Sequence, residues 1–365
     1  MKNVFICSLV IVLCASCFHR TENKNENENQ LSVISTDGQI TLSDLYHKAK
    51  FIPFENGEKS MLSSVKKTIV KAGNVFLLDV EPYPSIKVFS TNGEYIRNIG
   101  DLGRGKGEYT DIEDFTMNFS GDSVFLLCNN RVLAYDNKGN FLFYKDIDIT
   151  GVIRRIESCN GGYVCLTEYK GNDYLLHFLD YNFKTKKDLI SSDGRIIKEP
   201  SDVVNPIQVY GKKVWYYNWF NSTFYVIDTQ DDYKISSFKI NTGKACEIDQ
   251  FEDYVFTSDY DAVSNFFVVE NMIFGMFHTA QFGDKPFSWD LNSNEIKVNS
   301  YSEWLPYVRA VSSDSYYSIL EQDAFIRLSK QMEHLKNFNH NYFDVFSRPI
   351  TEKDNFILVE LSPKK

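Results

Sequence analysis

The chain has 365 residues and a formal net charge of −10, and 43% of its residues are hydrophobic. Because nucleic acid and anionic lipid surfaces are themselves negative, this charge balance argues against both as partners. A chain of this length can bury a large core, so its stability need not depend on disulfides.

The N-terminus is predicted to be a signal peptide over residues 1–16. Lys2 precedes a short apolar run, Val4–Leu13, which is well below the roughly 20 apolar residues that cross a bilayer. The small residues before Cys17 resemble the end of a bacterial lipoprotein signal, in which the cysteine is lipidated. We therefore expect an exported protein held to the bacterial outer membrane through a lipid on Cys17, facing either the periplasm or the cell surface. An ordinary secretory signal is the alternative.

The next segment is predicted to be a tether. Residues 18–30 are polar and charged and could not form a core, so residues 17–37 are expected to be disordered. About 13 residues of such coil reach roughly 20 Å, enough to hold a domain just off a membrane. The folded domain is expected over residues 38–365.

A sequence pattern recurs through this domain: a strand, a short polar hinge and a second strand. The hinge falls at Ser90, Asp136, Asp180, Asp228 and Asp290. The spacings between these positions are 46, 44, 48 and 62 residues. A repeat of 40 to 50 residues built from short strands is typical of the blade of a β-propeller. The longer last step predicts an insertion in the blade around residues 250–298.

Two strand-like segments at the ends of the domain are left without partners by these five repeats. They are Lys50–Phe54 and Asn355–Glu360. Pairing them would build a sixth blade and remove the exposed edges of an open ring. The predicted fold class is therefore all-β, a six-bladed β-propeller, with seven blades as the alternative. One helix is expected over residues 315–337, where Leu320, Leu328 and Leu335 recur at helical spacing, and a structural cap is its expected role.

Asn160 and Gly161 form a two-residue hairpin turn between two cysteines. That register places Cys165 opposite Ile156 and not opposite Cys159. No disulfide is therefore expected between these two cysteines.

A glycine-rich string, residues 100–109, is the most distinctive motif of the chain. Its spacing approaches that of a phosphate-binding loop, but Gly107 replaces the hydroxyl residue that would hold magnesium, and a strand follows instead of a helix. The string resembles the Gly-x-Gly-Pro-Gly-Glu-Tyr loop of the six-bladed β-propeller lipoproteins of Bacteroidetes, which are NHL-like in shape; Lys106 replaces the proline. The resemblance implies a six-bladed ring and an exported lipoprotein, and it brings no catalytic residue. Arg104 and Glu108 are candidate ligand contacts.

Two further groups of residues are candidates for a binding site. The aromatic segment 213–220 is expected mainly to be core, with Trp219 the residue most able to reach a ligand. The carboxylates around Asp114 could form a solvated acidic rim or, in a glycosidase, a catalytic pair.

The function expected from the sequence is binding or scaffolding, with the ligand unknown. No catalytic constellation, metal-ligand spacing or cofactor motif is recognisable, so no catalytic residue, metal or cofactor is assigned. A glycan, a peptide or an envelope protein is the expected partner, nucleic acid is not, and the lipid anchor is the only expected contact with a membrane. The alternative is a carbohydrate-active enzyme, a glycoside hydrolase or lyase, that uses acidic loop residues.

Overall fold

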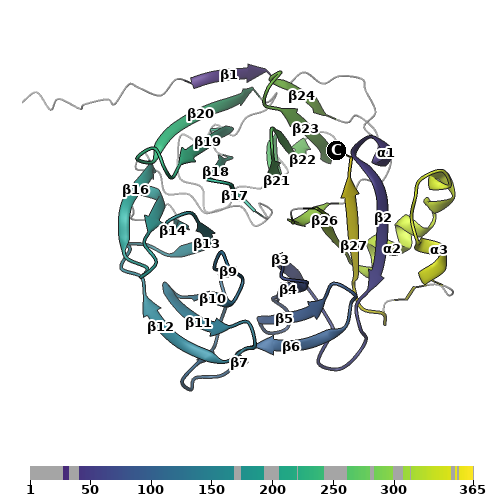
Figure 1. Cartoon of the computed structure of the whole chain (residues 1–365), viewed down its shortest axis with the longest axis horizontal. Helices are drawn as coiled ribbons and strands as arrows, with labels where there is room; N and C mark the ends of the chain where they lie inside the picture. The colour runs from purple at the N-terminus through teal and green to yellow at the C-terminus, as the bar shows by residue number, and fades with distance from the viewer. Residues whose placement is uncertain are drawn as a thin grey trace, which may run out of the picture.

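Six small antiparallel sheets form a closed ring in the computed structural model, which confirms the predicted six-bladed propeller (Figure 1). The structure describes residues 28–32, 41–167, 174–192, 205–219, 221–241, 261–279, 283–298, 307–312, 314–346, 350–351 and 353–364. In every blade four strands are ordered from the centre of the ring outward and pair antiparallel with their neighbours; in blade 4 a fifth strand, β1 (Glu28–Ser32), adds parallel to the outer edge.

The first three blades follow one another along the chain. Blade 1 consists of β3 (Val65–Lys71), β4 (Asn74–Asp79), β5 (Ser85–Ser90) and β6 (Tyr95–Ile99). Blade 2 consists of β9 (Asp114–Met117), β10 (Ser123–Cys128), β11 (Arg131–Asp136) and β12 (Phe141–Asp146). Blade 3 consists of β13 (Ile153–Cys159), β14 (Gly162–Thr167), β15 (Tyr174–Leu179) and β16 (Thr185–Ser191).

The second half of the ring has the same order. Blade 4 consists of β17 (Ile207–Tyr210), β18 (Lys213–Asn218), β19 (Thr223–Asp228) and β20 (Lys234–Asn241). Blade 5 consists of β21 (Ala262–Val269), β22 (Met272–Thr279), β23 (Gly283–Asp290) and β24 (Glu295–Val298). Blade 6 consists of β25 (Val308–Val311), β26 (Tyr316–Leu320), β27 (Ile357–Pro363) and β2 (Tyr46–Pro53).

The recurring hinge is the turn between the third and the outer strand of blades 1 to 5. At this position the Asp136 carboxylate accepts hydrogen bonds from the backbone N–H groups of Lys138 (2.9 Å) and Asn140 (2.8 Å). Asp180 and Asp290 hold their own turns in the same way. Short side chains with an acceptor oxygen are favoured here because they satisfy the backbone of a tight turn locally. The extra length before Asp290 falls in residues 242–260, outside the described residues, and not inside blade 5.

The ring closes through the pairing that the two ends of the domain predict. β2 pairs antiparallel with β27, with Phe51 opposite Val359. β2 is thus the outer strand of a blade whose other three strands come from the C-terminal part of the chain. Buried Asn355 strengthens the closure, because its amide accepts from the N–H of Leu62 (3.1 Å) and donates to the carbonyl of Ser60 (2.9 Å).

The glycine-rich string is the crossover from blade 1 to blade 2. Its ends form two short parallel strands, β7 (Asp101–Leu102) and β8 (Glu108–Tyr109). Between them the Glu108 carboxylate accepts a 2.6 Å hydrogen bond from the N–H of Gly105. Gly107 has φ +77°, and a Cβ there would lie 2.6 Å from the Phe141 ring. A side chain at this position would therefore be strained both by the backbone and by its neighbour.

The helical prediction for residues 315–337 is partly wrong. Its first third is the strand β26, rich in aromatic and branched residues, which pairs with β25 and β27. Helix α2 (Gln322–Ser329) follows, then the 3₁₀ turn η2 (Met332–Leu335), and two further short helices are α1 (Leu42–Leu45) and α3 (Tyr342–Val345). Phe325 and Leu328 of α2 pack on Phe51 of β2, so this part of the chain caps the outside of blade 6 as expected (Figure 1).

Two other predictions concern the cysteines and the tether. Cys165 lies opposite Ile156, and Cys159 and Cys165 are free thiols, as the register predicts; Cys128 is free as well. Part of the expected disordered tether is instead a strand: β1 (Glu28–Ser32) pairs parallel with β20. Residues 1–27, which include Cys17, lie outside the described residues.

Candidate functional site: the central channel

The inner strands of all six blades line one cavity of about 560 Å³ at the centre of the ring. They are β3, β9, β13, β17, β21 and β25 (Figure 1). Because every blade has the same strand order, the inner strands run in the same direction, and the bridge between Asn205 and Asn265 is parallel. Late residues of these strands therefore gather at one mouth, and early residues lie at the opposite end. The volume lies in the range of small-molecule binding sites.

Side chains on the inner strands tie each blade to the next. An inner strand is the edge of its sheet, so its unpaired backbone groups need other partners. Lys71 Nζ donates to the carbonyl of Asn118 (2.8 Å), and Asn265 Nδ2 donates to the carbonyl of Val308 (2.9 Å). The hydroxyl of Thr116 accepts from the N–H of Ser158 (3.0 Å) in the same manner. The wall of the channel is held together by these bonds.

The strongest of these ties is a buried ion cluster across blades 1, 2 and 3. Lys67 Nζ lies 3.0 Å from Asp114 Oδ2 and 2.7 Å from Glu157 Oε1. Asp114 Oδ2 also accepts from the N–H of Ile156 (2.8 Å). Burial alone would lower the pKa of Lys67, but the two carboxylates outweigh it and raise that pKa above its usual value. Burial raises the pKa of Glu157, and Lys67 offsets part of that rise.

Two other cations of the channel have no carboxylate within ion-pair distance among the described residues. Burial lowers the pKa of Lys71, opposed by the charge of Asp122. Burial also lowers the pKa of Arg309, opposed by Tyr307 and Glu321. Desolvation without a close counter-ion disfavours a positive charge. The channel therefore carries an excess of poorly compensated positive charge.

Three residues that line the cavity hold buried polar atoms without a hydrogen-bond partner in the described part of the chain. They are Thr68 Oγ1, Gln208 Nε2 and Arg309 Nε. Thr68 is only 5% exposed. Native proteins pair almost all such groups with protein, water or ligand, so unpartnered groups beside a cavity indicate where a ligand or ordered water binds.

Arg104 and Glu108 lie elsewhere, on the exposed glycine-rich crossover between blades 1 and 2. Neither lines the cavity. Glu108 has a structural role there, because its carboxylate holds the N–H of Gly105. A ligand contact by these two residues stays a prediction, separate from the channel.

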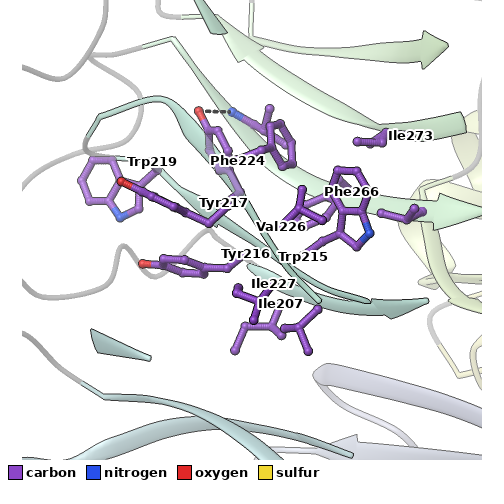
Figure 2. Close-up of a cluster of buried hydrophobic side chains, with 14 of the residues drawn as sticks. Ile207, Trp215, Tyr216, Tyr217, Trp219, Phe224, Val226, Ile227, Phe266 and Ile273 are labelled. Carbon is purple, nitrogen blue, oxygen red and sulfur yellow. Dashed lines mark hydrogen bonds between the residues drawn. The ribbon is translucent and has the colours of Figure 1, made fainter. Parts of the chain in front are cut away.

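Asp114 and Trp219 are both buried. Asp114 belongs to the ion cluster behind the channel wall and does not line the cavity. Trp219 is 4% exposed and belongs to the core shared by blades 3, 4 and 5, with Trp215 and Tyr217 (Figure 2). Residues 214–219 are buried, which confirms the preference for a core role there, and the expectation that Trp219 would escape the core is wrong. The hydroxyl of Tyr217 accepts a hydrogen bond from the N–H of Val263 (3.3 Å), which ties this segment of blade 4 to blade 5.

Sequence reasoning did not identify Lys67, Glu157 or Arg309. The repeat itself carried the missing signal, since Lys67 and Asp114 are 47 residues apart, about one blade, and both lie on inner strands.

The described residues contain no group of three or more His, Cys, Asp or Glu side chains placed to hold a metal ion. No helix among them is long and apolar enough to cross a membrane.

The fold and its lined channel define the chain as a six-bladed β-propeller. It belongs to the family described as a domain of unknown function (DUF4934), which matches residues 27–362. No curated protein matches the sequence.

Two solved structures support the fold. A protein of Bacteroides fragilis described as exported superposes with a TM-score of 0.71 at 17% identity, covering 92% of this chain and 100% of that one. A member of the DUF4221 family from Bacteroides vulgatus superposes with a TM-score of 0.51 at 9% identity, covering 88% of this chain and 97% of the other. At these identities the likeness concerns the fold alone.

Proposed function

We propose that this chain is an exported, lipid-anchored β-propeller that binds a small ligand in its central channel. The observation that carries the proposal is the cavity of about 560 Å³ whose lining residues include unpartnered buried polar atoms. Loop- and strand-lined cavities with a few convergent polar groups are the usual form of a ligand site. Export and the anchor are inferred from the sequence before Cys17 and from the NHL-like lipoproteins that the chain resembles.

A carbohydrate-active enzyme is the alternative, and the arrangement of carboxylates favours it less. A glycosidase needs two carboxyl groups that face its substrate across open space. Here Glu157 lines the cavity but Asp114 does not, and both are bound to Lys67. A scaffold for an envelope protein is a further alternative that needs no channel ligand.

A thermal-shift screen of the purified protein against glycans, peptides and divalent metals tests the proposal. A ligand that binds only the folded state stabilises it by about 2.7 kcal/mol at 100 times its Kd, which is visible as a raised melting temperature. A Ser158→Trp variant, which places a bulky ring on the cavity wall, should lose that shift. Thr185→Trp, on the exposed outer strand of the same blade, is the control and should keep it. A shift that survives Ser158→Trp contradicts the channel site.

The anchor is tested separately with a Cys17→Ser variant in the native bacterium. Lipid labelling and membrane fractionation should both be lost in the variant. Unchanged membrane association would contradict anchoring through Cys17.

A further inference from the structure

We infer that the channel ligand is acidic and that its carboxylate binds at Arg309; the geometry points to the acidic end of a saccharide. This inference rests on the proposed function, because it names the class of ligand that the same cavity would hold.

The charge of the cavity wall favours an acidic ligand. Of the cations that line the cavity, Lys67 is neutralised by Asp114 and Glu157, whereas Arg309 and Lys71 have no ion-pair partner in the described part of the chain. Glu157 is the acidic residue among those lining the cavity, and it is held by Lys67 at 2.7 Å. A ligand carboxylate would therefore meet net positive charge, and its own charge would oppose the effect of burial, which lowers the pKa of Arg309.

The guanidinium of Arg309 is held in place and keeps a donor for a ligand. One guanidinium nitrogen, Nη1, donates to the carbonyl of Val65 (3.2 Å), and the group lies 5.1 Å from the ring centre of Tyr307. Nε has no partner among the described residues. A guanidinium held by a carbonyl at Nη1 and by a ring on its face keeps Nε as a donor that an acid group of a ligand can use.

Other residues of the same cavity wall offer uncharged polar groups and aromatic rings. Thr68, on the neighbouring strand β3, and Gln208, on β17, each keep an unpartnered polar atom, and these uncharged groups suit sugar hydroxyls. At the ends of the inner strands, Phe119 is 59% exposed and Tyr210 is 38% exposed, and both line the cavity. Exposed aromatic faces pack well on the apolar faces of sugar rings. Because the six inner strands surround the cavity, a saccharide chain would enter it end-on through a mouth of the ring.

The probe for the test is digalacturonate, and its dimethyl ester is the neutral counterpart. Isothermal titration of the wild-type protein should show binding of the acid, weakened by added salt because the attraction is ionic. Arg309→Gln should raise the Kd about 10- to 100-fold, the usual effect of losing a hydrogen bond to a charged group. The ester should bind the wild-type protein more weakly by a similar factor.

Arg97→Gln is the matched control. Arg97 Nη1 donates to the carbonyl of Asn137 at 3.2 Å, the same kind of tie between blades that Arg309 makes, but on an outer strand away from the cavity. It should leave the Kd unchanged. Should Arg309→Gln fail to fold, Thr68→Val, which keeps the side-chain shape, should still weaken binding of digalacturonate several-fold.

A second arm uses a tripeptide with a free C-terminal carboxylate and the same tripeptide as its amide. If the peptide acid binds through Arg309 and digalacturonate does not, the saccharide assignment is wrong. If no acid binds better than its neutral counterpart, the whole inference is overturned. A neutral saccharide that binds the wild-type protein but not Ser158→Trp would overturn the inference and leave the proposed channel function standing.

Discussion

Replacing Lys67 by Met tests the ion cluster that joins three blades. The substitution keeps the length and apolar stem of the side chain and removes its ammonium. Asp114, whose side chain is 1% exposed, and Glu157, 17% exposed, would then lose the cation that lies within 3.0 Å of both. Breaking a buried ion pair on one side costs about 3–5 kcal/mol because a charge is left uncompensated. For a chain of this size that corresponds to a fall in Tm of about 4–7 °C.

The loss of stability in Lys67→Met should depend on pH, and the direction of that dependence follows from the pKa of Glu157. Burial already raises this pKa, and removing Lys67 takes away the main influence that lowers it. A carboxyl whose folded-state pKa lies above its unfolded value favours the folded state at low pH and loses that contribution as pH rises through the folded pKa. The deficit of Lys67→Met should therefore be largest near pH 7 and shrink toward pH 5.

Urea unfolding followed by tryptophan fluorescence at pH 7 and pH 5 measures both effects. Lys187→Met is the control, because its pair with Asp232 (3.4 Å) is exposed, 39% and 95% on the two side chains. Exposed pairs contribute about 0–1 kcal/mol. The reasoning is refuted if Lys67→Met costs no more than Lys187→Met, or if its cost is the same at both pH values.

Three other predictions concern stability and reactivity. Gly107→Ala should destabilise the protein by about 1–3 kcal/mol more than Gly73→Ala in chemical unfolding. Both glycines have positive φ, but only at position 107 would the added Cβ clash with Phe141. Equal losses in the two variants would contradict this account of the crossover. Burial raises the pKa of the Cys128 thiol to about 12, so peptide mapping should show almost no alkylation of Cys128 at pH 8 until the protein unfolds. Asn355→Ala removes hydrogen bonds to the backbone of Glu55, Ser60 and Leu62 and should lower the unfolding free energy by about 2–4 kcal/mol. A loss below about 0.5 kcal/mol would show that Asn355 does not hold the closure.

The ring could be predicted from sequence because its signals are local and repeat. Each hinge, such as Asp136, caps its own turn, and the sequence pattern around it recurs at the blade period. The closing pair of terminal strands followed from counting what was left unpaired. The helix over 315–337 was overextended because Leu320, the last residue of β26, fits both a helical period and a buried central strand, and pairing with β27 decides between them.

The channel could not be derived in the same way. Arg309 and Thr68 come from blades 6 and 1, which meet only because the ring closes, so no local spacing connects them. Trp219 was expected to reach a ligand because composition does not say which residues at the end of a strand are covered. The orientation came from the packing of blade 4 against blade 5.

The most direct test of the central claim is a crystal structure of the protein with the first compound that raises its melting temperature. The account predicts that the compound lies inside the ring, between the inner strands, with an acidic group hydrogen-bonded to Arg309. A compound bound instead on the outside of the ring, for example at the exposed side chains Leu142 and Phe143 of β12, with the channel unchanged, would contradict it.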